Sequence, residues 1–385
     1  MIKLKVLGAV FLGALVLAGG FVAAKSPADF TQGTPEIQSM SALTFTSDGV
    51  LFIGDGKGGA IFAVDLKEKP PATAVEEAPA IQNIEEKIAS LLGTTADEIM
   101  IHDLAVSPVS QNIYLSVSRG RSKWDTRWLL PNDIADASIL LRVGPEGEIG
   151  EVTLKDVAYA KAALPNPVDA SKTHQWKKGI TLRADTITDM SFSEGTLYVA
   201  GLSNEEFSST MWRIPFPFSE KTTATTLEIF HGAHGEYETH APIRAFVPYA
   251  LSGKEHLLAA YLCTPLVTFP VANLKDGQHV KGRTVAEFGS GNYPIDMVLY
   301  KKDGEDRLLI ANSNLPFMVV KTKDVESYKG EITTEPEGYL AGVPYEPRSG
   351  TGVQQLDTFN AGYVVALQRL PGGTMDLVAL SLKRF

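Results

Sequence analysis

The stretch that decides the fold is residues 296–320, which read DMVLYKKDGEDRLLIANSNLPFMVV. Three short apolar runs, at 297–299, 308–310 and 317–320, alternate here with polar turn sequences. Apolar runs of this length between turn signals are typical of buried β-strands. The stretch therefore predicts three antiparallel strands that follow one another in a meander.

The same pattern recurs along the chain. Clear copies begin at Asp103 and Asp189, and weaker copies begin at Ala42, Arg244 and Gln355. Self-similarity of this kind indicates a β-propeller, whose repeating units, the blades, bury their faces only against neighbouring blades. We therefore predict an all-β, six-bladed propeller, with a seventh blade inside one of the longer intervals as the alternative.

The spacing of the copies predicts where the ring is interrupted and how it closes. The intervals Ala42 to Asp103 and Asp103 to Asp189 exceed the roughly 40–50 residues of an ordinary blade. In the first interval, the apolar spacing over 84–92 predicts a short amphipathic helix on the rim. The last copy has no fourth strand, and we expect a segment within 27–40 to supply it and close the ring.

The N-terminus resembles a secretory signal. Lys3 and Lys5 precede an apolar run over 6–22, and small residues at 22–24 suit cleavage after Ala24. We predict a signal peptide at 1–24 and a single propeller domain at 25–385, located in the periplasm or outside the cell. No later segment is apolar enough to span a membrane.

Charge and motifs narrow the classes of partner. The 385 residues carry a net charge of −10 and no basic-aromatic stripe, so nucleic acid is not an expected partner. A small polar ligand or a protein partner remains. Cys263 is the one cysteine, and no CxxCH motif occurs, which excludes a covalent c-type haem.

Three aspartates hold equivalent places in the repeat. Asp103, Asp189 and Asp296 each begin a predicted innermost strand, with Arg244 and Gln355 in the same column and His102 adjacent. Converging carboxylates with amide oxygens suit a hard cation such as Ca²⁺. Two other interpretations stay open, namely aspartates that cap turns through backbone N–H groups and an anion or sugar site centred on arginine.

A second candidate site is the loop HGAHGEYETH at 231–240. His231, His234 and His240 could bind Zn²⁺ or Cu²⁺ here, less expected than Ca²⁺ at the aspartates. Cys263 is expected to project from the adjoining blade on the same face. A packed or solvated loop is the alternative. The loops that join second to third strands, including Asn204 and Asn312, add amides around the same face as candidate ligand-binding residues.

The units at 294–314 and 41–55 resemble the repeat of NHL and gluconolactonase/paraoxonase-type propellers. In lactonase-type members of that superfamily an axial Ca²⁺ is held at first-strand starts. By position the resemblance implies such a site at Asp103, Asp189 and Asp296, although Ala42 stands where those members have Glu.

Three functions follow, and the sequence leaves open whether the protein is an enzyme. The first is an exported propeller that binds a small polar ligand, a metal or a protein partner at its His/Asp-rich axial face. The second is a Ca²⁺-dependent hydrolase of the lactonase type. The third is a non-catalytic scaffold subunit of a periplasmic redox complex.

Overall fold

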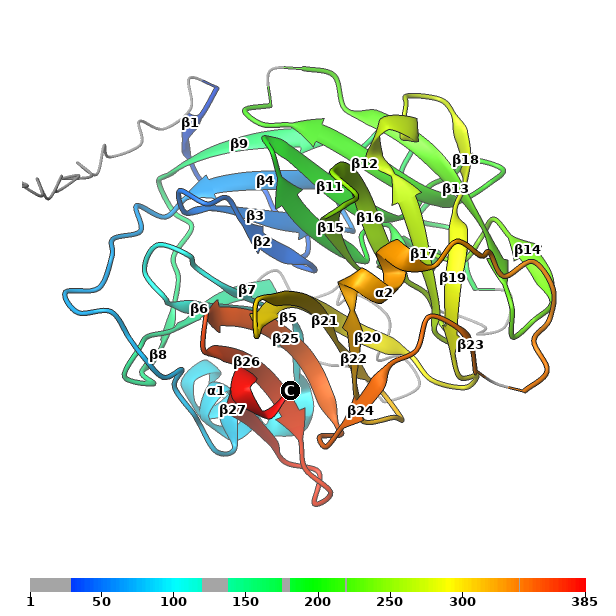
Figure 1. Ribbon diagram of the computed structural model, residues 1–385. Coiled ribbons are helices and arrows are strands. Elements are labelled where there is room, and N and C mark those ends of the chain that lie inside the picture. The colour runs from blue at the N-terminus through cyan, green and yellow to red at the C-terminus, as the bar shows by residue number, and fades with distance from the viewer. Residues whose placement is uncertain (1–28, 120–137, 175–180, 219, 339) are drawn as a thin grey trace, which may run out of the picture.

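The computed structural model is a six-bladed β-propeller, as the repeat predicts (Figure 1). It describes residues 29–119, 138–174, 181–218, 220–338 and 340–385. The predicted signal peptide at 1–24 lies outside the described residues. Within these ranges no helix is both long enough and apolar enough to cross a bilayer.

Each blade is an antiparallel sheet whose innermost strand lies nearest the axis. The first blade runs outward through β2 (Leu43–Phe45), β3 (Val50–Asp55), β4 (Ala60–Asp65), β9 (Val157–Ala163) and β1 (Thr31–Gly33). The second runs through β5 (Ile99–Val106), β6 (Ile113–Arg119), β7 (Ser138–Val143) and β8 (Ile149–Glu151). The third runs through β10 (Asp189–Ser193), β11 (Thr196–Leu202), β12 (Ser209–Pro215), β13 (Thr223–His231) and β14 (Glu236–Glu238).

The remaining three blades follow in chain order. The fourth consists of β15 (Ala245–Leu251), β16 (Lys254–Ala260), β17 (Pro265–Pro270), β19 (Arg283–Phe288) and β23 (Leu340–Gly342). Between β17 and β19, β18 (His279–Lys281) leaves to pair in parallel with β13 of the third blade. The fifth consists of β20 (Pro294–Lys302), β21 (Glu305–Asn312), β22 (Phe317–Lys321) and β24 (Glu346–Arg348). The sixth consists of β25 (Val353–Asn360), β26 (Tyr363–Arg369) and β27 (Met375–Ser381).

Helices are few in the part of the chain that is described. The α-helices are α1 (Ile84–Leu92) and α2 (Thr322–Ser327), and short 3₁₀ turns occur at Ala96–Glu98, Leu182–Asp185, Val271–Asn273 and Leu382–Arg384. The bounds of α1 confirm the helix predicted at 84–92. Its buried residues include Ile84, Ile88 and Leu92.

Tight turns in the first hairpins fix the strand register. The pairs Glu194-Gly195, Ser252-Gly253 and Asp303-Gly304 join the two innermost strands of the third, fourth and fifth blades, and both residues of each pair have positive φ. Two-residue turns of this kind match the twist of antiparallel strands. These turns fix which residues of the innermost strand lie opposite which residues of the second strand.

The blades do not follow one another around the ring in chain order. Separate buried clusters join the first blade to the second and to the third. Other clusters join the third to the fourth, the fourth to the fifth and the fifth to the sixth. The last cluster joins the sixth to the second. The chain therefore builds its second blade on one side of the first, returns through β9 to complete the first, and continues on the other side.

The N-terminal closure predicted at 27–40 is wrong. β1, within that segment, pairs with β9 at the rim of the first blade, with Thr31 opposite Tyr159. Strand β9 already provides the fourth strand there, so the N-terminal segment only extends this sheet. The prediction failed because the long interval after Asp103 contains β9, a strand of the first blade. The first and last blades are therefore not neighbours in the ring, and the sixth blade meets the second.

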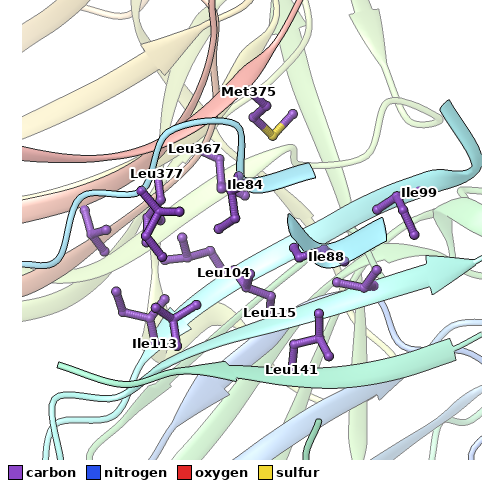
Figure 2. Close-up of a cluster of buried hydrophobic side chains, with 14 of the residues drawn as sticks. Ile84, Ile88, Ile99, Leu104, Ile113, Leu115, Leu141, Leu367, Met375 and Leu377 are labelled. Carbon is purple, nitrogen blue, oxygen red and sulfur yellow. The ribbon is translucent and has the colours of Figure 1, made fainter. Parts of the chain in front are cut away.

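The ring closes instead between the sixth and second blades, through the segment that contains α1. Ile81 forms a β-bridge with Leu377 on the outer strand of the sixth blade. Arg369 donates to both carboxylate oxygens of Glu85, at 3.1 and 2.8 Å. In Figure 2, Ile84 and Ile88 of α1 belong to one buried cluster with Leu377 of the sixth blade and Leu115 of the second. The buried apolar surface of this junction stabilises the closed ring.

Candidate functional site

The strand pairing is irregular just before two of the predicted aspartates, Asp103 and Asp296. The register of β5 against β6 shifts between Ile101 and Asp103, and that of β20 against β21 shifts between Pro294 and Asp296. Such β-bulges re-aim a side chain relative to regular pairing. A third aspartate, Asp189, is the first residue of β10.

A fourth aspartate, Asp357 on β25, joins these three, and the sequence analysis missed it. Gln355 takes the aligned position in the repeat, because it follows a register shift in the same way as Asp103 and Asp296. Alternate residues of a strand share a face, so Asp357 faces the same side as Gln355, two residues farther along. The signal was present as the sequence Gln-Leu-Asp at 355–357. We call Asp103, Asp189, Asp296 and Asp357 the axial carboxylates.

The axial carboxylates share one pattern of hydrogen bonds. In each, Oδ1 accepts the N–H of the following residue, at 2.6–2.8 Å. Oδ2 accepts a backbone N–H from the innermost strand of the next blade. These inter-blade donors are Leu43 to Asp103 at 2.6 Å, Phe246 to Asp189 at 2.8 Å, Leu356 to Asp296 at 2.9 Å and Val106 to Asp357 at 2.7 Å. The backbone N–H bonding proposed as an alternative is thus present, and it links blades as well as capping strands.

The axial carboxylates surround a chamber at the propeller axis. The cavity has a volume of about 220 Å³, enough for several water molecules. All six innermost strands line it, and the residues are Leu43–Phe45, Asp103–Ala105, Asp189–Ser191, Phe246, Val247, Asp296–Leu299 and Leu356–Thr358. We call this cavity the axial chamber. The predicted convergence of Asp103, Asp189 and Asp296 on the axis is therefore seen.

Burial and mutual repulsion make the chamber electrostatically unusual. Burial raises the pKa of Asp103 to about 7 and that of Asp357 to about 6. Burial, followed by the charge of Asp103, raises the pKa of Asp189 well above its usual range, and Asp296 behaves likewise. The backbone N–H donors lower these pKa values by less than burial raises them. A cation in the chamber would favour the ionised carboxylates.

Gln355 and His102 lie beside the chamber without lining it. The Gln355 amide donates to the His102 carbonyl at 2.7 Å, which ties the sixth blade to the second. Nε2 of His102 lies 2.8 Å from Oγ of Ser118. Burial lowers the pKa of His102 to about 4, so its imidazole is neutral at pH 7.

Arg244 belongs to an ion-pair cluster near the starts of β10 and β15. Its guanidinium pairs with Asp185 at 3.0 Å, and His174 approaches the other oxygen of that carboxylate at 3.2 Å. Burial alone would raise the pKa of Asp185, but Arg244 and His174 lower it to about 2. Because Arg244 is committed to Asp185, it does not project into the axial chamber.

The predicted histidine loop divides into two parts. His231, at the end of β13, and His234 lie close to Cys263 of the fourth blade, and one donor atom from each lies within 4.8 Å of the others. Exposed His240 lies apart from this group, with Nδ1 3.2 Å from Oγ of Ser208. We call His231, His234 and Cys263 the His–Cys cluster.

The predicted loop amides have different roles. Asn312 is buried and holds its own turn, since its amide donates to the carbonyl of Pro316 at 3.1 Å and its oxygen accepts from Asn292 at 2.9 Å. Asn204 is exposed, and its backbone N–H donates to the carbonyl of Asn166 at 2.9 Å. Asn312 therefore shapes its loop, whereas the side chain of Asn204 is available to solvent.

No model of a known protein family matches the sequence, and no curated protein matches it. Solved structures of similar fold include an oxidoreductase described as a glucose dehydrogenase from Thermus thermophilus, at 12% identity over 91% of this chain and 99% of that chain, with a TM-score of 0.37. Extracellular domains 1–2 of Drosophila semaphorin 1b match at 10% identity over 91% and 86%, with a TM-score of 0.39. The PQQ-bound aldose sugar dehydrogenase of Streptomyces coelicolor matches at 10% identity over 92% and 99%, with a TM-score of 0.34.

These similarities concern the propeller fold, and at such identities and TM-scores they carry no argument about function. The resemblance to NHL and gluconolactonase/paraoxonase-type propellers stays a prediction.

Proposed function

We propose that this protein is an exported β-propeller that binds a hydrated divalent cation in the axial chamber. The observation that carries the proposal is the convergence of four carboxyl groups, from four blades, on one cavity. Export is proposed from the signal-like sequence at 1–24. Among the ligands considered from the sequence, a cation fits best a chamber lined by four carboxyl groups.

The hydrogen bonds hold the axial carboxylates ready for a cation. Two backbone N–H groups fix each carboxylate, and each oxygen keeps a further lone pair. Burying several carboxylates without a counter-charge is unfavourable, as their raised pKa values show. A bound cation would relieve this repulsion without disturbing the backbone contacts.

The spacing of the carboxylates favours a cation that keeps its water shell. Two oxygens on one Ca²⁺, each at 2.3–2.6 Å from it, lie at most about 5 Å apart. Within the described ranges, no three carboxylates bring oxygen atoms within 4.8 Å of one another. Direct ligation by three aspartates would therefore need movement of the innermost strands, whereas bridging waters fit the 220 Å³ chamber.

The test is a thermal-stability titration of the full mature chain with CaCl₂ and with MgCl₂, at constant ionic strength. Ligand at 100 times Kd stabilises a protein by about 2.7 kcal/mol, so the Tm of the wild type should rise by several degrees. The double variant D189N/D296N should lose most of this response. An unchanged wild-type Tm, or an equal rise in both proteins, would overturn the proposal.

Export is tested separately, by the intact mass of the protein recovered from the periplasm or medium. Cleavage after Ala24 predicts a mature chain that begins at Lys25. Full-length protein in the membrane fraction would contradict the export proposal and leave the cation proposal standing.

A further inference from the structure

The His–Cys cluster lies between the third and fourth blades, away from the axial carboxylates. His231 ends β13, His234 lies in the turn that leads to β14, and Cys263 lies in the loop between β16 and β17. Their donor atoms form, among the described residues, the one group of three His, Cys, Asp or Glu ligand atoms within 4.8 Å of one another. Donors of a tetrahedral ion with bonds of 2.0–2.3 Å are separated by somewhat less than this, so small side-chain movements complete the site.

Glu238 contacts both imidazoles at their Nδ1 atoms. On β14, its Oε1 lies 2.9 Å from Nδ1 of His231 and 2.5 Å from Nδ1 of His234. The two rings approach with centroids 3.8 Å apart. A carboxylate on one ring nitrogen fixes the tautomer that leaves the other nitrogen as a metal donor. The Nε2 atoms of both histidines are thus the available ligands.

His231 is a buried histidine whose ring nitrogens lack hydrogen bonds. Its side chain is 2% exposed, and within the described part of the chain neither Nε2 nor Nδ1 forms a hydrogen bond, although Nδ1 lies 2.9 Å from the Glu238 carboxylate. Buried polar atoms are nearly always paired, and an unpaired one calls for an absent group. The carboxyl group of Glu287 accepts the N–H of Gly232, the residue after His231, at 2.6 Å.

The cysteine is held in an unusual backbone conformation. Cys263 and Thr264 have φ values of 60° and 65°, in the left-handed region that non-glycine residues rarely adopt. Three bonds hold the loop: Cys263 N–H to Asn292 O at 2.9 Å, Thr264 N–H to Tyr261 O at 3.0 Å, and Thr264 Oγ1 to Gly289 O at 2.7 Å. The surrounding structure therefore imposes the conformation that brings the thiol to the histidines.

We propose that the His–Cys cluster is a Zn²⁺ site with Nε2 of His231, Nε2 of His234 and Sγ of Cys263 as its three protein ligands. Two imidazoles and one thiolate suit Zn²⁺ rather than the hard cations of a carboxylate site. Three protein ligands leave the fourth tetrahedral position to water or an exchangeable molecule. The side chain of His234 is 47% exposed, which gives an ion a path from solvent.

The experiment is equilibrium binding of Zn²⁺ to the full mature chain, with Co²⁺ as a spectroscopic substitute. The wild type should bind one Zn²⁺, and Co²⁺ should give a thiolate-to-metal charge-transfer absorption. Cys263→Ser should abolish that absorption, and His234→Ala should weaken Zn²⁺ binding by at least roughly 10–100-fold, the loss produced even by removing a residue that only orients a ligand. Neither residue is fully buried, so both variants should fold.

Two controls separate this site from the axial chamber and from surface binding. His240→Ala removes an exposed imidazole of the same loop and should leave Zn²⁺ affinity unchanged. D189N/D296N should also bind Zn²⁺ like the wild type. Absence of Zn²⁺ binding by the wild type, or equal affinity in the wild type and both cluster variants, would overturn the proposal.

Discussion

The axial carboxylates and the His–Cys cluster are two sets of donor side chains built in different ways. The carboxylates come from equivalent positions of repeated blades, so the ring spreads them around a chamber of about 220 Å³. The His–Cys donors come from one irregular loop and a neighbouring turn, and they gather within 4.8 Å. Repetition therefore produces a wide site, whereas an irregular loop produces a compact one.

The largest expected effect is on the free energy of unfolding, and it tests how much the axial carboxylates stabilise the fold. Asp296→Ala removes the acceptor of two backbone N–H groups, those of Met297 and Leu356. Each buried donor left without a partner costs about 1–3 kcal/mol, so we expect a loss of about 2–6 kcal/mol for the two. Urea denaturation at pH 5, where repulsion among the carboxyl groups is small, measures it.

Cys263→Ala is the matched comparison, since within the described ranges the backbone hydrogen bonds of this loop do not involve the thiol. It should cost less than about 1 kcal/mol, the ordinary range for a partly exposed side chain. Similar losses of unfolding free energy in Asp296→Ala and Cys263→Ala would contradict the idea that the axial carboxylates stabilise the fold more than the His–Cys cluster does.

The next effect is a dependence of stability on pH. The folded-state pKa of Asp103, about 7, lies above the ordinary value of 3.8, so the folded protein binds more protons than the unfolded chain between these values. Stability must then fall as pH rises through this window. In EDTA, we expect a loss of about 1–3 kcal/mol between pH 5 and pH 8 from this group.

Asp103→Asn should make that fall shallower, because the amide does not titrate, while the raised pKa values of Asp189, Asp296 and Asp357 keep part of the pH dependence. Denaturation midpoints of both proteins, compared at several pH values, check the prediction. A wild-type protein that becomes steadily more stable between pH 5 and pH 8 would contradict it.

A smaller effect is expected when the orientation of the imidazoles is loosened. Glu238→Gln keeps an oxygen acceptor but removes the charge that contacts both Nδ1 atoms. Loss of a carboxylate that orients metal-binding histidines typically weakens metal binding roughly 10–100-fold. Zn²⁺ titration should show this loss, while the Tm response to Ca²⁺ stays at the wild-type level; a parallel loss of both responses would mean that the two sites are coupled.

The smallest effect is expected at His240, which the sequence grouped with His231 and His234. It is exposed and contacts Ser208. His240→Ala should change the free energy of unfolding by less than about 0.5 kcal/mol, as surface substitutions usually do. Urea denaturation checks this, and a larger loss would show that the loop depends on His240 for its conformation.

Features that arise from repeated local patterns could be predicted from the sequence, whereas features that depend on pairing between strands far apart in the chain could not. Six blades, the helix at 84–92 and the convergence of Asp103, Asp189 and Asp296 all follow from local apolar patterns repeated along the chain. Asp357 was missed because aligning the repeats selects one position per strand, here Gln355. A strand presents every second residue to the same side, so Asp357 faces the axis as well. The approach of Cys263 to the histidine loop was predicted from the shared face of the ring.

The order of the blades could not be predicted from local pattern. Strand β9 pairs directly with β4, with Ala60 opposite Ala163, although all four strands of the second blade lie between them in the sequence. Nothing in the apolar run at 157–163 distinguishes a strand of the first blade from one of the second. The error about ring closure has the same origin, because the partner of the last sheet is the segment around Ile81.

The return of β9 to the first blade has a consequence for how the protein is made. Chains are synthesised from the N-terminus, and domains generally fold as the chain emerges. The outer edge of β4 finds its partner only when residues 157–163 have been added, after all four strands of the second blade. The first blade therefore cannot be completed before the second, and a chain that folds from its N-terminus exposes an unpaired strand edge until β9 has been added. Completion of the first blade therefore depends on the segment that follows the second.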